Sequence, residues 1–386
     1  MRKVNLLCVI TKLELGGAQT QLLSLLKNID QNRFNLFLFT AQNGLLNDEV
    51  SRCTGLTFYR SDYLDRPINP LKDALALVEI FRFIKKYKID IVHTHSSKAG
   101  IVGRWAAALA GVKLIIHTVH GWSFNDFQPS LARRIFIGLE RFNATFTDKI
   151  IVVSDHDKKK GLSHRIGREL QYCLIHYGVD EPLFKTKDPA IRGELGIAAG
   201  DLVVGTVSCF KPQKALEDFL ELAFLICQTL PRTKFLVVGD GALRKKIEKR
   251  ISDHGLQTNV VLTGWRRDIP RVLSAMDVFV LTSLWEGMPI AAIEAMAAGL
   301  PVFATHTGGV SEIVKDGKTG GLVPCQDMTF MLQKIIPLLE NEALRKQVGQ
   351  NARESVSDRF KVEDMIKKTE YLYARSLEED PRTHAH

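Results

Sequence analysis

The sequence predicts an α/β protein built from two doubly wound domains, and three observations support this prediction. The chain has 386 residues, more than one ordinary hydrophobic core usually organises. Short apolar runs alternate with amphipathic segments, as is typical of parallel sheets with helices on both faces. The alternation stops in a polar stretch at 180–200 and then starts again. Each half is therefore expected to form its own sheet.

The first half begins with the apolar run NLLCVIT and continues as alternating strand and helix patterns. Strands are predicted at 5–11, 34–40, 89–95, 113–120 and 149–154. Helices are predicted at 18–29, 74–87, 98–111 and 131–146. We assign residues 1–185 to this N-terminal Rossmann-like domain.

The second half repeats the pattern without close sequence similarity to the first. Strands are predicted at 202–208, 234–240, 260–264, 278–283 and 301–306, and helices at 217–230 and 289–299. We assign residues 186–363 to a second Rossmann-like domain. Residues 364–386 are expected to form a C-terminal helix that packs back on the first domain and ends in a frayed tail. Two such domains are expected to face each other across a cleft, because open parallel sheets bind ligands beyond the carboxyl ends of their strands.

The composition is that of a globular protein without membrane spans or metal-binding cysteines. Apolar residues make up 45% of the chain and charged residues 25%. There is no run of 18 uncharged apolar residues. The six cysteines form no CxxC pair, so neither a zinc site nor a disulfide framework is predicted. Reduced cysteines, and an apolar N-terminus without a small-residue cleavage site, indicate a cytoplasmic protein.

The positive charge is concentrated in the first half. Residues 1–185 contain 26 Lys and Arg against 17 Asp and Glu, whereas the remaining residues contain 26 of each kind. This excess favours an anionic partner, such as phospholipid headgroups or a phosphorylated substrate. Nucleic acid is not expected, because no helix-turn-helix, zinc finger or RNA-binding signature accompanies the charge. A solvated basic face remains the alternative.

The stretch EGMPIAAIE at 286–294 places two carboxylates eight positions apart around the start of a predicted helix. Pro289 suits the first helical position, and amides at a helix start favour phosphate or sugar oxygens. Gly287 permits close approach of the backbone. The side chain of Glu294 leans toward the start of the helix, so it can face the same ligand as Glu286. On spacing alone, the alternative is a turn residue and a solvent-facing helix acid.

Other candidate residues lie at predicted sheet edges. Gly16 and Gly17 form a turn before a helix, where the backbone can meet a phosphate. Lys214 follows the strand at 202–208 and can neutralise a diphosphate. His120 ends the strand at 113–120 and can donate a hydrogen bond to a ligand. The alternatives are a surface lysine and a core histidine.

No metal site and no dinucleotide site are predicted. His93, His95 and His117 lie near one another on strand ends, but no carboxylate accompanies them at ligand spacing. The sequence DHD at 155–157 has the spacing of a metal-binding acid pair, yet its place after a strand favours a helix cap. GDGALR at 239–244 lacks the third glycine of a dinucleotide fingerprint.

A longer stretch, EGMPIAAIEAMAAGLPVFATHTGG, resembles the E-x7-E segment of the retaining, nucleotide-sugar-dependent glycosyltransferases of group 1 (family 4), which have the GT-B fold. The resemblance covers nearly the whole chain in the order of the family. It includes LGGAQTQLLSL (15–25), IVHTHSSKAGIVGR (91–104), HTVHGWSF (117–124), KIIVVSD (149–155), IHYGVD (175–180), FKPQK (210–214), VVGDGALR (237–244) and LTGWRRDIPRVLSAMDVFVLTS (262–283).

The resemblance implies a role for each candidate residue. Glu286 would contact hydroxyls of the transferred sugar, and Glu294 would bind the ribose hydroxyls of the nucleotide. Lys214 and His120 would stabilise the leaving diphosphate, so the expected catalytic residues are His120, Glu286 and Lys214. The expected donor-binding residues are Gly16, Gly17, Gly287, Met288, Pro289, Glu294 and Arg266, the last of these beside the base.

The implied reaction moves a hexose from a nucleotide-diphosphate sugar to a hydroxyl, with retention at the anomeric carbon. A UDP-sugar is the favoured donor, and neither a cofactor nor a metal is expected. The expected acceptor is a lipid-linked glycan in cell-envelope polysaccharide or lipopolysaccharide synthesis, bound by the N-terminal domain. The enzyme would then act in the cytoplasm, peripherally on the inner face of the cell membrane, with its basic first half toward the anionic lipid surface.

One position departs from the family pattern. Cys209 stands where the family usually has an arginine, five positions before Lys214, and a thiol cannot hold a phosphate as a guanidinium does. Lys211 is a candidate replacement. The departure leaves open the alternative of a nucleotide-sugar-binding protein with weak or no transferase activity. An epimerase of the same fold is a separate alternative. Acceptor choice is expected to depend on the loops at 55–72 and 121–131.

Overall fold

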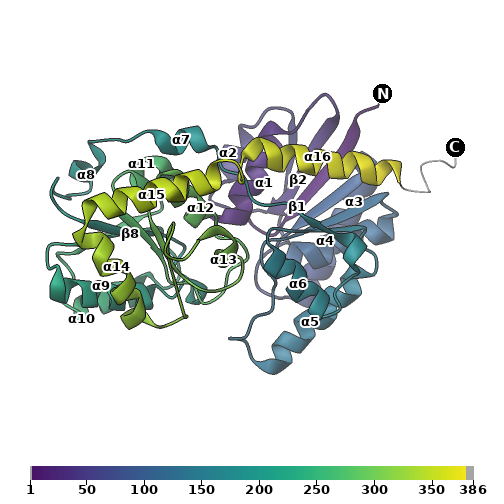
Figure 1. Cartoon of the computed structure of the whole chain (residues 1–386). Coiled ribbons are helices and arrows are strands. Elements are labelled where there is room, and N and C mark those ends of the chain that lie inside the picture. The colour runs from purple at the N-terminus through teal and green to yellow at the C-terminus, as the bar shows by residue number, and fades with distance from the viewer. Residues whose placement is uncertain (1, 380–386) are drawn as a thin grey trace. The chain divides into compact units, whose positions relative to one another are not determined.

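The computed structural model describes residues 2–379 and divides the chain into two compact units. Of the described residues, unit 1 combines 2–177 with 362–379, and unit 2 comprises 178–361 (Figure 1). The expected frayed tail at 380–386 lies outside the described residues. No helix in residues 2–379 has both the length and the apolar character needed to cross a membrane.

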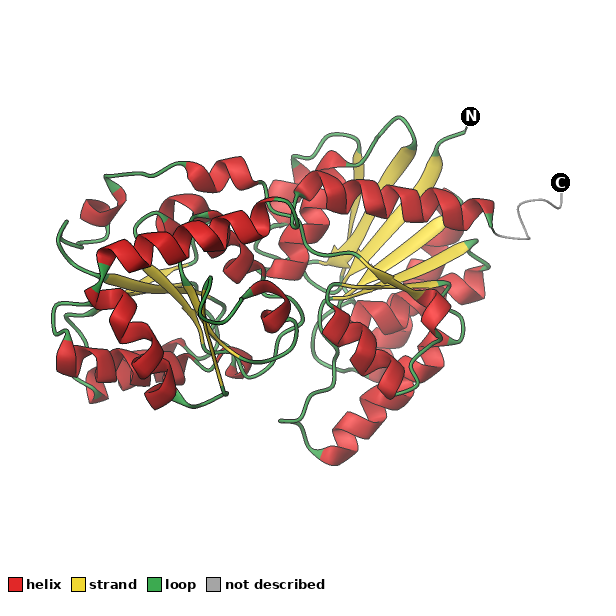
Figure 2. Ribbon diagram, in the orientation of Figure 1, coloured by secondary structure: helices red, strands yellow, loops and turns green. Residues whose placement is uncertain are grey.

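Unit 1 is built on a parallel sheet, whose strands are yellow in Figure 2. The sheet has seven strands in the order β3-β2-β1-β4-β5-β6-β7. The strands are β1 (Val4–Ile10), β2 (Phe34–Ala41), β3 (Leu56–Ser61), β4 (Ile91–His95), β5 (Leu114–Val119), β6 (Lys149–Val152) and β7 (Tyr172–Leu174). The helical segments are α1 (Gly17–Asn28), α2 (Asn47–Ser51), α3 (Pro70–Tyr87), α4 (Ser97–Ala110), α5 (Ser130–Ala144), α6 (Asp155–Ser163), η1 (Glu169–Gln171) and α16 (Val362–Glu378). Buried side chains of α1 and α16 form one apolar core with the strands, and those of α3 and α4 form another.

Helix α16 belongs to unit 1 through a fully buried side chain. Tyr373 is packed with α1 and the sheet, and its hydroxyl lies 2.6 Å from Nδ1 of His93 on β4. The boundary predicted at 185/186 is wrong by eight residues, because the segment at 178–185 is bonded into unit 2. The amide of Val179 donates to the carbonyl of Phe360, and Ser357 donates to Glu181.

Unit 2 is built on a parallel sheet of six strands in the order β10-β9-β8-β11-β12-β13. The strands are β8 (Val203–Val207), β9 (Lys234–Val238), β10 (Val260–Gly264), β11 (Val278–Leu281), β12 (Val302–Thr305) and β13 (Gly320–Val323). The helical segments are α7 (Glu181–Lys185), α8 (Ile191–Glu194), η2 (Pro212–Lys214), α9 (Leu216–Thr229), α10 (Arg244–Asp253), α11 (Ile269–Leu273), α12 (Ile290–Ala297), α13 (Val310–Ile313), α14 (Met328–Glu340) and α15 (Glu342–Ser357).

The predicted acceptor loop at 55–72 is not a loop throughout. It contains the edge strand β3, whose partly exposed side chains give a weak strand signal. It also contains the start of α3, four residues before the predicted start. Asn69 caps this helix by accepting the amide of Lys72, and Pro70 occupies the first helical position, where no N–H is needed.

Each sheet has one point at which the strand order reverses. In unit 1 this point lies between β1 and β4, and in unit 2 between β8 and β11. Loops that leave such neighbouring parallel strands diverge to opposite faces, which opens a ligand site at the carboxyl ends of the strands. The two switch points therefore locate the candidate functional residues.

The first testable prediction concerns a buried ion pair between α4 and α5. Arg104 and Glu140 are 1% and 3% exposed, and their side chains meet at 2.7 Å. Glu140→Ala should lower the free energy of unfolding by about 3–5 kcal/mol, because it leaves a buried guanidinium without its carboxylate. Urea unfolding followed by circular dichroism measures the loss. The double variant Arg104→Met/Glu140→Leu should be clearly more stable than Glu140→Ala; equal losses would contradict this account.

Candidate functional site

The switch point of unit 2 is bridged by an ion pair between Lys214 and Glu286. Lys214 ends the loop after β8, and Glu286 lies in the loop after β11. The ammonium lies 2.5 Å from Oε1 of Glu286, and the two side chains are 17% and 7% exposed. Burial favours the neutral amine, but the carboxylate of Glu286 outweighs burial and raises the pKa of Lys214. Lys214 is therefore a fixed positive charge with ammonium protons left for a ligand.

Hydroxyl and amide groups hold the two loops together. Ser283, which the sequence did not single out, donates to Oε1 of Glu286 at 2.6 Å. The hydroxyl of Thr282 lies 3.0 Å from the carbonyl oxygens of both Lys214 and Ala215. Ala215 has a left-handed backbone conformation, which is uncommon for a residue other than glycine. The structure thus fixes the geometry of Glu286 and Lys214 before any ligand is present.

The glycines after β12 press against the loop that carries Glu286. Gly308 has a φ of +54°, and a Cβ at this position would lie 1.7 Å from the carbonyl oxygen of Glu286. The amide of Gly309 donates to the carbonyl of Gly287 at 2.8 Å, and Thr307 donates to that of Leu284. The TGG of the sequence therefore serves to position Glu286 and Gly287.

The residues between the two glutamates have different environments. The side chain of Met288 is buried, so only its backbone can reach a ligand. Pro289 is the N-cap of α12 and the helix starts at Ile290, one residue later than predicted. The first amides of α12 are free of intrahelical bonds, as at any helix start.

Glu294 is the candidate whose side chain the fold leaves open for a partner. It lies in the second turn of α12 and is half-buried. Within residues 2–379, its carboxyl makes no hydrogen bond or ion pair. Burial raises the pKa of Glu294 to about 8. A half-buried carboxyl without a protein partner is costly to ionise, and a ligand that donates hydrogen bonds would remove that cost.

Arg266 does not lie at the switch point that Glu286 and Lys214 bridge. It follows β10 at the edge of the sheet, and its guanidinium is bonded to Asp268 and Glu194. These acids raise the pKa of Arg266 and occupy much of its donor fork. A contact with a donor base would have to use what remains of that fork.

Cys209 lies close to Lys214, where the resemblance led us to expect an arginine. Lys211 occupies the N-cap position of the short helix η2 in the same loop, without a side-chain capping bond, and its ammonium forms no ion pair within residues 2–379. Lys211 is thus available as a second positive charge, beside Lys214, at the carboxyl end of β8.

In unit 1, His120 is held from both ring nitrogens. Its Nε2 lies 3.0 Å from Nδ1 of His95, and its Nδ1 lies 2.7 Å from the hydroxyl of Tyr177. Burial lowers the pKa of His120 to about 3, so the ring is neutral near pH 7. Sequence reasoning missed Tyr177, although it lies in the quoted IHYGVD. His95, Thr118 and Tyr177 also line a cavity of about 40 Å³ beside His120.

Gly16 and Gly17 lie at the other side of the unit 1 switch point. Gly16 is the N-cap of α1, and the first turn of this helix has neither a side-chain cap nor an acidic residue. The loops at this switch point are joined by Thr11 and Ser96, whose hydroxyls lie 2.8 Å apart. The first amides of α1 therefore have neither a capping side chain nor a nearby acid in the helix, as a phosphate site at a helix start requires.

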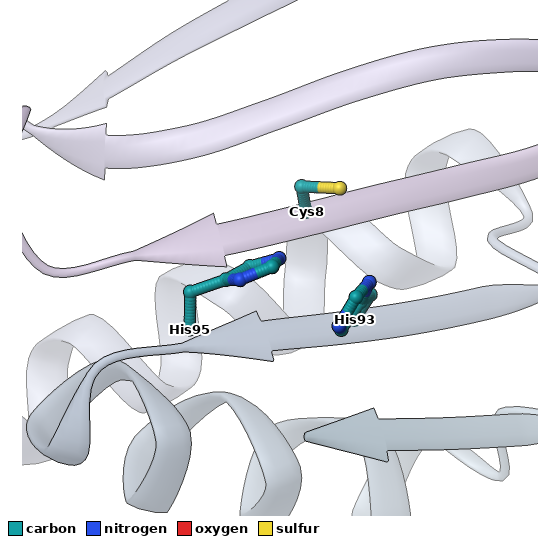
Figure 3. A group of neighbouring side chains, drawn as sticks. All are labelled: Cys8, His93 and His95. Atoms are coloured by element: carbon teal, nitrogen blue, oxygen red, sulfur yellow. The ribbon is translucent and has the colours of Figure 1, made fainter. Parts of the chain in front are cut away.

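Cys8, His93 and His95 come close enough to suggest a metal centre (Figure 3). Their nearest ligand atoms all lie within 4.8 Å of one another, on the paired strands β1 and β4. However, His93 already shares its two ring nitrogens with Tyr373 and Thr118, at 2.6 Å each. Burial raises the pKa of Cys8 to about 12, which keeps the thiol protonated. Among the described residues, Nε2 of His95 is buried without a hydrogen-bond partner, so one ring nitrogen of the cluster is free. A single free nitrogen beside a protonated thiol and an occupied His93 does not supply the ligands that a metal centre needs.

Two family sequence models match the chain, one in each half. The model of Glycosyltransferase Family 4 matches residues 15–181, and the model of Glycosyl transferases group 1 matches residues 187–355. The UDP-Gal:alpha-D-GlcNAc-diphosphoundecaprenol alpha-1,3-galactosyltransferase of Escherichia coli is 33% identical over 368 residues, which span 93% of this chain and 94% of that protein. The N-acetyl-alpha-D-glucosaminyl L-malate synthase of Bacillus anthracis is 27% identical over 302 residues, 77% of each chain.

Solved structures share the fold. HepE of Anabaena, crystallised in complex with UDP and glucose, has a TM-score of 0.84 at 22% identity, over 96% of this chain and 100% of that chain. Sucrose-phosphate synthase from Thermosynechococcus elongatus has a TM-score of 0.85 at 23% identity, over 97% and 99%. This likeness confirms the fold class predicted from the sequence.

The second testable prediction concerns the open carboxyl of Glu294. Its pKa of about 8 exceeds the ordinary value of 4.5, so the folded state binds this proton more tightly than the unfolded state. The stability conferred by this proton is complete below about pH 4.5 and is lost as the pH rises through 8. Glu294→Gln should therefore match the wild type at pH 5 and melt at least about 3 °C higher at pH 8.5.

Thermal unfolding at the two pH values tests this prediction. Glu340→Gln, an exposed acid on α14, is the control and should change neither melting temperature. A pH-independent effect of Glu294→Gln would show that the carboxyl of Glu294 is ionised in the folded protein.

The third testable prediction concerns the tautomer of His120. Tyr177→Phe removes one of its two hydrogen bonds and should cost about 1 kcal/mol of stability. The ¹⁵N NMR signals of the ring should change from one tautomer to a mixture, because Nδ1 loses its partner. Tyr63→Phe is the control. An unchanged ring spectrum in Tyr177→Phe would show that His95 alone fixes the tautomer.

Proposed function

Because the chain belongs to the group 1 glycosyltransferases, we propose that it transfers a hexose from a UDP-sugar to a hydroxyl of a lipid-linked, diphosphate-bearing glycan. The observation that carries the donor assignment is the open carboxyl of Glu294, eight positions after a Glu286 that is already fixed by Lys214. A carboxylate can accept hydrogen bonds from both free hydroxyls of a ribose. The relative from Escherichia coli carries a UDP-sugar in its name, and HepE was solved with UDP, which supports this nucleotide.

The charges at the unit 2 switch point suit the departure of a diphosphate. Lys214 is a buried, fixed cation, and Lys211 adds a second ammonium in the same loop. We propose that both lysines stabilise the negative charge that develops on the leaving diphosphate. Cations held in place beforehand lower the activation barrier of the transfer most at that position. Two lysines would thus take the place of an arginine at Cys209.

We propose that the transfer proceeds with retention and without a covalent enzyme intermediate. Glu286 is bonded to Lys214 and Ser283, so it is better suited to orient sugar hydroxyls than to attack carbon. The bond between the anomeric carbon and the phosphate oxygen breaks, and the acceptor oxygen bonds to that carbon on the same face. The acceptor proton passes to the departing phosphate oxygen, and the diphosphate leaves with the electron pair.

We assign the acceptor to unit 1. The name of the relative from Escherichia coli includes a GlcNAc sugar on diphosphoundecaprenol, which is a lipid diphosphate. The excess of positive charge in residues 1–185 suits a diphosphate acceptor and an anionic membrane. The enzyme would then work peripherally at the cytoplasmic face, where nucleotide sugars are available.

The fourth testable prediction is a donor panel. UDP-, GDP-, ADP- and CMP-sugars are titrated calorimetrically into the wild type, Glu294→Ala and the control Glu340→Ala. One UDP-sugar should bind the wild type and the control alike, and should bind Glu294→Ala at least about tenfold more weakly, because the ribose hydroxyls lose their acceptor. The same sugar should be slowly hydrolysed, and Lys214→Ala should slow hydrolysis by about 100-fold.

Binding should also release a proton below pH 8, because hydroxyl donors favour the ionised form of Glu294. Donor affinity should therefore rise with pH up to about 8 and then level off. Binding of another nucleotide would overturn the UDP assignment. Equal binding by Glu294→Ala would overturn the role given to Glu294.

A further inference from the structure

Helix α5 exposes large apolar side chains along one side. Leu131, Ile135 and Phe142 are 69%, 55% and 53% exposed. At about 100° per residue, these three positions lie within roughly 40° of one another around the helix. Ile137 and Asn143 face the interior instead. The exposed residues therefore form a stripe opposite the packed side of the helix.

Helix α4 continues this stripe. The ring of Trp105 contacts that of Phe142, with centroids 5.5 Å apart, and Leu109 is exposed one turn farther along α4. We call Trp105, Leu109, Leu131, Ile135 and Phe142 the α4–α5 surface. Five large apolar residues on two packed helices exceed the scattered apolar exposure that is usual on soluble proteins.

The exposed charges on α4 and α5 themselves have one sign, and the nearby acid Asp126 is paired with Arg133. Arg134 and Arg141 lie roughly 60–80° round α5 from Leu131. Within residues 2–379, Arg134 forms no ion pair, and Nε of Arg141 donates to a backbone carbonyl. The only acid in α4 and α5 is Glu140, which is buried with Arg104.

We propose that the α4–α5 surface docks unit 1 on an anionic lipid bilayer, with its apolar residues among the acyl chains and its arginines at the headgroups. An apolar stripe with aromatic residues and flanking arginines is typical of helices that lie in a membrane interface. Arginine stems can lie along the apolar boundary while the guanidinium reaches a phosphate.

Two features favour lipid over a protein partner. The positive excess of the chain lies entirely within residues 1–185, so an anionic surface attracts this part first. The acceptor proposed above is itself a membrane lipid, and to this extent the inference rests on the proposed function. Docking by α4 and α5 would hold the acceptor-binding unit at the bilayer without a membrane-spanning helix.

Vesicle sedimentation tests the inference with the whole protein. Vesicles of phosphatidylethanolamine with 30% phosphatidylglycerol are compared with vesicles of pure phosphatidylcholine. The wild type should sediment with the anionic vesicles and much less with the neutral ones. Leu131→Ser/Ile135→Ser should bind at least about tenfold more weakly, because two apolar side chains no longer leave water. Arg134→Gln should bind about fivefold more weakly, since one cation near the surface is lost.

Matched controls separate this surface from general effects. Leu183→Ser removes an equally exposed leucine from unit 2, and Lys245→Gln removes an exposed cation from α10; neither should change vesicle binding. Melting curves of all variants establish that they fold. If the wild type ignores anionic vesicles, or if Leu131→Ser/Ile135→Ser binds as the wild type does, the inference is wrong. It is also wrong if sedimentation velocity shows that this surface joins two copies of the chain and the lipid does not compete.

A donor-hydrolysis assay in detergent distinguishes failure of this inference from failure of the proposed function. Leu131→Ser/Ile135→Ser should hydrolyse the UDP-sugar at the wild-type rate, because neither residue lies at a switch point and hydrolysis uses water in place of the acceptor. Leu131, at the end of the predicted acceptor loop 121–131, is in fact an exposed residue of α5. If the wild type binds vesicles but no nucleotide sugar, the docking surface stands and the proposed donor falls. If the wild type hydrolyses the UDP-sugar but does not bind vesicles, the proposed donor stands and the docking surface is wrong.

Discussion

The ion pair between Lys214 and Glu286 is the interaction around which the candidate site of unit 2 is organised. It crosses the single point at which the sheet order reverses, between β8 and β11. Parallel strands supply no hydrogen bonds between loops beyond their ends, so the loops need bonds of their own. Thr282 and Ser283 provide them, and Gly308 lets a third loop press on the backbone of Glu286. A charged pair is therefore held ready at the place where an open α/β sheet can bind a ligand.

Unit 1 meets the same requirement with neutral groups. Thr11 and Ser96 join the loops at its switch point, and His95 on β4 is linked to His120 after β5 by a hydrogen bond rather than by charge. Burial lowers the pKa of both rings, which removes charge where unit 2 retains it. This difference supports the proposed roles, in which unit 2 binds the diphosphate of the donor and unit 1 positions the acceptor.

The sequence was sufficient to predict both parallel sheets, because buried strands and amphipathic helices leave distinct periodicities. It failed at short or edge elements such as β3 and β13, where exposed side chains or glycines weaken the strand signal. Glu286 and Lys214 were predicted separately, from motif and resemblance. Their direct contact, and the bonds from Ser283 and Tyr177, depend on distances between loops that no local pattern encodes. The pairing of Arg266 with Asp268 and Glu194 was missed for the same reason.

The proposed function depends on where unit 2 binds a nucleotide. The most direct measurement is a crystal structure of the protein with UDP bound. We expect both ribose hydroxyls within about 2.6–3.2 Å of the Glu294 carboxylate, and a phosphate oxygen on the ammonium of Lys214. Glu286 should remain bonded to Ser283, with its second oxygen open toward the position of the sugar. The account would be contradicted if UDP bound away from the carboxyl ends of β8 and β11, or if Glu294 still had no hydrogen-bond partner in the complex.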